Sequence, residues 1–174
     1  MIVRAETPAD HAAVREVTAR AFAHHPGVDD LVNALRNGPG RISLVAEEDG
    51  AVVGHTMLSR GWVDAAPRLV DVLVLSPLSV DPPAQRRGIG GALVRAAIDA
   101  ADAAGTPAVF LEGSPRYYPR FGFVPGGRHG FTRPSVRIPE PAFQVVLLSK
   151  HEPWMTGALV YPDVFWALDF AGLR

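Results

Sequence analysis

The stretch LSPLSVDPPAQRRGIGGAL, Leu75–Leu93, joins an expected strand to an expected helix and contains residues that suit neither element. The residues that lead into it, RLVDVLVL (68–75), are apolar and β-branched, which is typical of a strand. Pro77 then falls inside this strand, although proline has no N–H to donate to a sheet. The helix begins with Gly88, Gly90 and Gly91, which are poor helix formers. The strand and the helix both contain unfavourable residues where they meet, which predicts that the backbone at this junction binds a ligand.

The glycine-rich turn is suited to a pyrophosphate. The first N–H groups of a helix have no intrahelical acceptor and lie at the positive end of its dipole. Glycines let a phosphate approach these groups, and Arg86 and Arg87 add positive charge. The turn is not a P-loop, because Gly90 is followed by Gly91-Ala92 where a P-loop needs Lys-Ser/Thr. It is not a Rossmann fingerprint either, because such a fingerprint starting at Gly88 would need glycine in place of Leu93. Close packing of helix and strand alone would leave residues 85–87 unexplained.

Pro77 indicates the same ligand site. A bulge at this proline would move the strand away from its neighbour and leave backbone groups of Leu78 and Val80 available. An extended, amide-bearing arm could then pair with them as an added strand would. A ligand with a pyrophosphate at one end and an amide-rich arm at the other is coenzyme A.

The same stretch resembles the acetyl-CoA-binding motif of the GNAT family of N-acetyltransferases. The residues that carry the motif are Leu78, Val80, Pro82, Gln85, Gly88 and Gly90. A second family signature, Tyr-x-x-x-Gly-Phe, is supplied by Tyr118, Gly122 and Phe123. The order of elements over residues 1–150 is also similar, and the segments SPRYYPRFGFVP and GALVYPDVF look most like a bacterial branch with largely unassigned substrates.

The resemblance implies direct attack of an amine on the thioester of acetyl-CoA, with no covalent enzyme intermediate. It implies that the N–H of Leu78 polarises the thioester carbonyl, that Val80 holds the pantetheine arm, and that Tyr118 is the general acid, with Tyr117 as the alternative. The expected cofactor-binding residues are Leu78, Ser79, Val80, Gln85, Arg86, Arg87, Gly88, Ile89, Gly90 and Gly91.

The acceptor side is less defined by the sequence. Many family members carry Asn directly after the strand that ends near Glu112, whereas this chain has Gly113 and Ser114. Glu112 is the first candidate for a base that deprotonates the acceptor amine, and His55 and Asp71 are alternatives. No metal site is predicted, because the pair of histidines at 24–25 lacks further ligands at metal spacing.

Five arginines lie between Glu112 and Glu140 with no acidic residue among them: Arg116, Arg120, Arg128, Arg133 and Arg137. If they face the cleft, they favour a substrate with a carboxylate or phosphate, or the cofactor's 3′-phosphate. The alternative is that they form a solvated loop surface. The tail after Lys150 is rich in aromatic residues and too apolar to be disordered. We expect it to pack on the core, to close over the acceptor cleft or to join a homodimer interface.

The pattern of elements predicts an α/β (α+β) fold in one domain, residues 1–174, with a core of residues 1–150 and a packed extension, residues 151–174. Strands are expected at 1–7, 42–60 (a hairpin turning at Asp49-Gly50), 68–80, 107–113 and 143–149, and helices at 8–22, 29–37 and 89–104. The resemblance implies a mixed, mostly antiparallel central sheet, flanked by helices and splayed at the cofactor site.

Composition limits the function classes. The net charge of −1 argues against a nucleic-acid or membrane-surface binder, and no apolar run reaches membrane-spanning length. The chain has no cysteine, which excludes thiol catalysis and fits a reducing cytoplasm. Three functions remain: an acetyltransferase for a small primary amine, an enzyme that acetylates a protein or aminoacyl-tRNA, and an acyl-CoA-binding sensor or assembly module without turnover.

Overall fold

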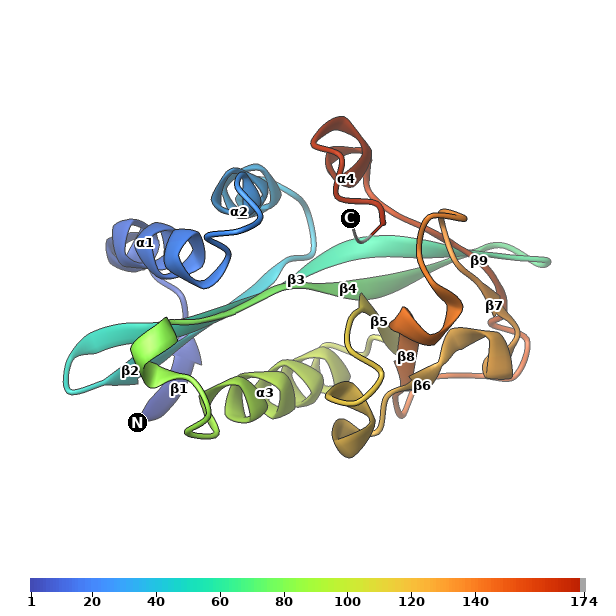
Figure 1. Cartoon of the computed structure of the whole chain (residues 1–174). Helices are drawn as coiled ribbons and strands as arrows, with labels where there is room; N and C mark the ends of the chain where they lie inside the picture. Colours follow the sequence, from blue (N-terminus) through green and yellow to red (C-terminus); the bar gives the residue numbers. More distant parts are fainter. Residues whose placement is uncertain (173–174) are drawn as a thin grey trace. The chain divides into compact units, whose positions relative to one another are not determined.

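The computed structural model describes residues 1–172, which form two compact units. Unit 1 comprises Met1–Ser59 and Leu75–Ala100, and unit 2 comprises Arg60–Val74 and the chain from Ala101 onward. Two long strands, β3 (Ala51–Ala65) and β4 (Leu69–Val80), run through both units (Figure 1). Among the helices of the described chain, none is long and apolar enough to cross a membrane.

The sheet of unit 1 is antiparallel. β1 (Ile2–Ala5) pairs with β2 (Ile42–Glu48), which pairs in turn with the first part of β3. The hairpin between β2 and β3 turns at Asp49 and Gly50, whose φ angles of 50° and 79° are those of a tight left-handed turn. The sequence prediction of this hairpin is confirmed.

Helices cover both faces of the sheet in unit 1. Helices α1 (His11–Ala21) and α2 (Val28–Arg36) lie over one face, and the first turns of α3 (Ile89–Ala103) lie over the other (Figure 1). The predicted helix at 8–22 begins as a 3₁₀ turn at Pro8–Asp10 before α1. Both the N–H and the hydroxyl of Thr7 donate to the Asp10 carboxylate at 2.8 Å, which fixes this start.

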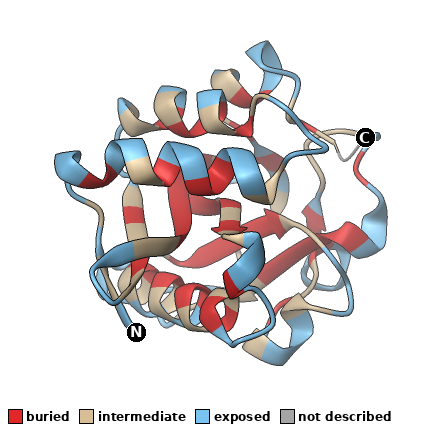
Figure 2. Ribbon diagram, turned by 60° about the vertical axis from the view of Figure 1, so that its left-hand side comes forward, coloured by how far each residue is buried: buried red, intermediate tan, exposed pale blue. Residues whose placement is uncertain are grey.

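Gly54 on β3 allows α3 to approach the sheet closely. A β-carbon at this position would lie 3.0 Å from Leu93, 3.1 Å from Ile89 and 3.2 Å from the backbone oxygen of Ser79. Because these distances are shorter than normal packing contacts, a side chain at this position would push against Leu93, Ile89 and the backbone of β4. The inward faces of helices and strands are buried (Figure 2).

Unit 2 adds the parallel and mixed part of the sheet. β4 pairs in parallel with β5 (Ala108–Glu112), at Leu73–Val109 and Val74–Phe110. β5 pairs antiparallel with β8 (Phe143–Leu147), and β8 with β6 (Val124–Pro125). The aromatic core of this unit is built on Phe110, which stacks on Phe143 and meets Phe131 edge to face.

The C-terminal part of unit 2 contains elements that the sequence did not predict. β9 (Gly157–Val160) pairs antiparallel with β3 and parallel with β7 (Phe131–Thr132). A short helix, α4 (Asp163–Ala167), follows it. These strands have two to four residues, too few to show a periodic pattern.

The predicted fold class is confirmed: the sheet is mixed and mostly antiparallel, and helices flank it. β4 continues through Pro77 to Val80, and the Ser76–Pro77 peptide bond is cis. The splay at the cofactor site and the division into a core and an extension stay predictions.

Candidate active site

The backbone at the end of β4 is directed by its pairing with β3. The N–H of Asp81 donates to the oxygen of Val53 at 2.9 Å, so the backbone of Asp81 faces β3. Along an extended strand, successive N–H groups alternate between the two sides. The N–H groups of Leu78 and Val80 therefore point to the side of β4 away from β3, as an oxyanion donor and a pantetheine partner would require.

The side chains of this segment are used for packing. Leu78 and Val80 pack against the buried cluster formed by Ala46, Ala84, Ile89 and Leu93. The Ser79 hydroxyl is buried and donates to Thr18 on α1 at 3.2 Å. The carbonyl of Val80 accepts a hydrogen bond from Gln85 Nε2 at 3.1 Å, which ties the following turn to the strand. The side chains of residues 78–80 are thus used for packing and hydrogen bonding within the fold.

The turn before α3 has a backbone that favours glycine. Gly88 has φ +89°, and a β-carbon there would touch nothing, so its conformation rather than space calls for glycine. The N–H of Ala92 donates to the oxygen of Gly88 at 3.0 Å, which is the first bond of the helix. The N–H groups of Ile89, Gly90 and Gly91 precede it and have no intrahelical acceptor. The Ile89 side chain is buried in the core.

Two arginines near the turn form ion pairs that the sequence did not reveal. Arg87 pairs with Glu48 of β2 at 2.9 Å, so its charge is partly offset. Arg20 of α1 donates to both carboxylate oxygens of Asp81, at 2.9 and 3.0 Å, and holds α1 against the end of β4. This contact joins residues 61 positions apart, a separation at which no local pattern signals a pair.

Tyr118 begins a 3₁₀ turn, Tyr118–Phe121, in unit 2. Its ring meets Phe123 and Tyr117 edge to face, with centroids 5.8 and 5.0 Å away. Burial raises the pKa of the Tyr118 hydroxyl above its usual value, so the group stays protonated at neutral pH. The phenol therefore carries its proton at neutral pH and is available as a proton donor.

Gly113 lies directly against Tyr118. A β-carbon at Gly113 would overlap the Tyr118 ring, and Gln144 Nε2 donates to the Gly113 oxygen at 3.1 Å. The departure from the family's Asn has a local cause, because any side chain at 113 would displace the ring. Tyr117, the alternative acid, has the guanidinium of Arg120 over its ring at 4.2 Å.

Glu112 is the last residue of β5, and its carboxylate has two donors. Tyr161 donates its hydroxyl to Glu112 Oε1 at 2.8 Å, and the backbone N–H of Gly172 also donates. Burial raises the pKa of Glu112, while these two donors oppose the rise. A carboxyl whose pKa is raised is suited to take a proton from an ammonium.

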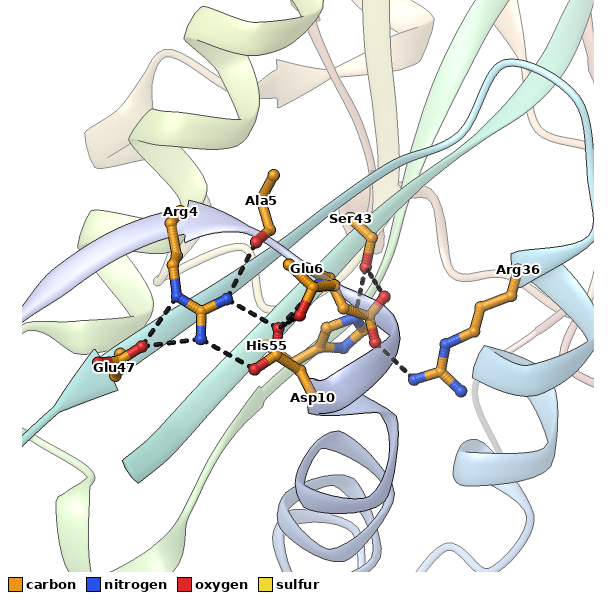
Figure 3. Close-up of polar contacts among 9 residues, drawn as sticks. Arg4, Ala5, Glu6, Asp10, Arg36, Ser43, Glu47 and His55 are labelled. Atoms are coloured by element: carbon orange, nitrogen blue, oxygen red, sulfur yellow. Dashed lines mark hydrogen bonds and ion pairs between the residues drawn. The ribbon is translucent and has the colours of Figure 1, made fainter. Parts of the chain in front are cut away.

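The other two candidate bases have different surroundings. The His55 ring is fully buried on β3, with Nε2 2.9 Å from the Ser43 hydroxyl, which donates to Glu6 at 2.6 Å (Figure 3). Glu6 is paired with Arg36 at 2.6 Å, and burial lowers the pKa of His55 to about 4. Asp71 is exposed and accepts from Arg60 at 2.7 and 2.9 Å. A substrate cannot reach the buried His55, and the charge of Asp71 is offset by Arg60. Glu112 therefore remains the best candidate for the base.

Three of the five arginines of the 112–140 region have partners within unit 2. Arg133 pairs with Glu140 at 3.3 Å, Arg137 pairs with Asp169 at 2.9 Å, and Arg120 lies over Tyr117. Within residues 1–172, no group of three or more His, Asp or Glu side chains is arranged to hold a metal ion.

Comparison with known proteins identifies the family, and two of the similar structures were solved with CoA or acetyl-CoA. The profile of the Acetyltransferase (GNAT) family matches residues 11–123. The uncharacterized N-acetyltransferase YjhQ of Escherichia coli (strain K12) is 35% identical over 134 residues, 75% of this chain and 74% of YjhQ. The crystal structure of the Escherichia coli GNAT family N-acetyltransferase YhbS in complex with CoA is 30% identical, with a TM-score of 0.83, over 94% of this chain and 91% of that one.

A GNAT family acetyltransferase from Brucella melitensis, solved in complex with acetyl-CoA, is 32% identical with a TM-score of 0.75. The superposition covers 94% of this chain and 97% of the Brucella chain. The chain belongs to the GNAT family of N-acetyltransferases, which are acyltransferases.

Proposed function

We propose that this protein transfers the acetyl group of acetyl-CoA to a primary amine by direct attack. The observation that carries the proposal is the turn before α3. There the N–H groups of Ile89, Gly90 and Gly91 lie at the positive end of the helix, next to the turn that Gln85 ties to β4. The relatives solved with CoA and acetyl-CoA support the identity of the ligand.

The cofactor would be held by backbone groups of unit 1. The N–H groups of residues 88–91 would bind the pyrophosphate, and Val80 would pair with the pantetheine arm. The N–H of Leu78, directed away from β3, would donate to the thioester oxygen and stabilise the negative charge that develops there. Arg86 and Arg87 would add positive charge near the phosphates.

Tyr118 is proposed as the general acid and Glu112 as the general base. Glu112 would take a proton from the acceptor ammonium, and the freed amine would attack the acyl carbon. The new C–N bond forms as the C–S bond breaks, and the departing thiolate receives the hydroxyl proton of Tyr118. The phenol of Tyr118 stays protonated at neutral pH, so it has this proton to give.

The proposal is tested by thiol release from acetyl-CoA with a panel of primary amines, alongside calorimetric titration of acetyl-CoA. We expect tight acetyl-CoA binding and amine-dependent release. Binding without release for any small amine, peptide N-terminus or aminoacyl-tRNA would indicate an acyl-CoA sensor instead. Release only with a peptide or aminoacyl-tRNA would replace the small amine by a macromolecular acceptor. A homodimer and a cytoplasmic location stay predictions from the sequence.

A further inference from the structure

The segment from Tyr161 to Gly172 begins and ends at one carboxylate. The Tyr161 hydroxyl donates to Glu112 Oε1 at 2.8 Å, and the backbone N–H of Gly172 donates to the same side chain. Ten residues, including α4, lie between these two donors. Glu112 is thus fixed from both ends of a segment that is distant in sequence.

This segment is anchored in the core by three buried residues, while Trp166 and Leu168 between them are exposed. Tyr161, Phe165 and Ala171 are all at most 3% exposed, and the rings of Tyr161 and Phe165 lie 4.9 Å apart. The N–H of Phe170 donates to the Phe165 oxygen at 2.7 Å, which closes the turn after α4. The donors to Glu112 are therefore held by a buried framework, which gives them a defined position.

The charges around Glu112 balance each other. Arg137 acts on the Glu112 carboxylate from nearby and lowers its pKa, but Arg137 is itself paired with Asp169 at 2.9 Å. Gly172 packs directly on Arg137, where a β-carbon would lie 2.8 Å from the Arg137 β-carbon. Arg137 is shared with Asp169. Burial raises the pKa of Glu112, and the hydrogen bond from Tyr161 is the largest effect that opposes this rise.

We propose that Tyr161 is a positioning residue for Glu112, and that the segment from Tyr161 to Gly172 completes the acceptor side of the acetyltransferase. This inference rests on the proposed function, because it assumes that Glu112 is the base. Tyr161 orients the carboxylate so that one oxygen remains directed to the acceptor ammonium. It also sets the pH at which the carboxylate is ionised and able to accept a proton.

The test compares Tyr161→Phe with the unmodified protein, using acetyl-CoA and the primary amine from the panel that is turned over fastest. The substitution removes one donor to the charged carboxylate, so the pKa of Glu112 rises. The acid limb of kcat/KM for the amine should move up by about 0.5–1 pH unit, with about a three- to tenfold loss of rate on that limb. The acetyl-CoA Kd should change by less than about twofold.

Two controls separate positioning from general damage. Hydroxylamine is largely unprotonated at neutral pH and needs no base, so its acetylation should be equally fast in Tyr161→Phe. Trp154→Phe also removes a donor from a carboxylate, that of the exposed Glu152, and should leave the amine profile unchanged. Phe165→Leu keeps the Tyr161 hydroxyl but loosens its support, and should give a smaller shift in the same direction.

The outcomes distinguish this inference from the proposed function. If Glu112→Gln acetylates the amine as fast as the unmodified protein, Glu112 is not the base, and both the role of Glu112 and the inference are lost. If Glu112→Gln is inactive with the amine while Tyr161→Phe keeps the original pH profile, only the positioning role of Tyr161 is overturned. A direct carbon-13 NMR titration of Glu112 with no upward shift in Tyr161→Phe would overturn it as well.

Discussion

The Tyr118 ring lies so close to Gly113 that a β-carbon at position 113 would overlap it. The backbone of Gly113 is itself fixed by hydrogen bonds, since its N–H donates to Ala142 and its oxygen accepts from Gln144. With the glycine held in this way, a side chain added there has to be relieved by movement of the tyrosine. The position of the Tyr118 ring therefore depends on the absence of a side chain at position 113.

Gly113→Ala should leave a folded protein in which Tyr118 is displaced. We expect a loss of about 1–3 kcal/mol in the free energy of unfolding, the usual effect of overpacking, and a fall in kcat of about tenfold or more because the acid is moved. The acetyl-CoA Kd should hardly change. Gly127→Ala is the matched control, because a β-carbon there meets nothing. Equal kcat values for the two variants would show that the ring position does not matter for turnover.

Tyr118→Phe should lower turnover far more than it weakens acetyl-CoA binding. Loss of a general acid costs about 10²–10⁴ in rate, whereas the aromatic packing against Phe123 is kept. Steady-state kinetics and calorimetric titration measure the two effects separately. Tyr117→Phe is made in parallel, and a larger fall in kcat for that variant would assign the acid to Tyr117.

Gly90→Glu should abolish acetyl-CoA binding while the protein stays folded. Glutamate is a better helix former than glycine, and a negative charge in the first turn of α3 is favoured by the helix dipole, so stability should not fall. The same charge and bulk would block a phosphate, and we expect the Kd to rise by at least about 100-fold, or about 2.7 kcal/mol. The exposed Gly127→Glu controls for charge alone. An unchanged Kd in a folded Gly90→Glu protein would place the pyrophosphate elsewhere.

The sequence predicted those features that are encoded by neighbouring residues. The Asp49-Gly50 turn, the start of α3 at Ile89 and the strand through Pro77 each follow from a short local pattern. The base candidate Glu112 was found because it stands at the end of an apolar run. Each of these signals comes from backbone preference or hydrophobic periodicity, which act over a few residues.

The remaining features depend on contacts between distant residues. Tyr161 meets Glu112 across 49 positions, and Arg20 meets Asp81 across 61. The sequence does not show that Gly54 lies against α3, because this contact forms only when the helix packs on the sheet. The chain of contacts from Arg36 through Glu6 and Ser43 to His55 likewise joins α2, the loop after β1, β2 and β3 of unit 1 (Figure 3). Such pairs are formed by tertiary packing, so a single sequence does not show them.

His55 gives a prediction about stability that is independent of catalysis. The Ser43 hydroxyl uses its one proton for Glu6, so His55 Nε2 carries the proton that is donated to Ser43. Nδ1 is then the unprotonated nitrogen, and it is buried with no partner among the described residues. Protonation of Nδ1 would place a charge in this interior, which is why burial lowers the pKa of His55 to about 4 from 6.5.

The direction in which stability changes with pH follows from the lower pKa of His55 in the folded protein. Between about pH 6.5 and about pH 4 the unfolded chain binds a proton at His55 that the folded protein does not, so stability falls as the pH falls. A shift from 6.5 to about 4 corresponds to about 3 kcal/mol in full. His55→Gln preserves a donor to Ser43 but does not titrate. Its unfolding free energy should therefore lack this contribution to the pH dependence.

Urea unfolding of both proteins at about pH 7 and about pH 4.5 measures the difference directly. Groups outside this network, such as Asp102, titrate in both proteins and cancel in the comparison. We expect the unmodified protein to lose about 2–3 kcal/mol more than His55→Gln over this range. Equal losses would mean that His55 takes up its proton as readily in the folded protein as in the unfolded chain, and that the buried arrangement around Ser43 does not keep the ring neutral.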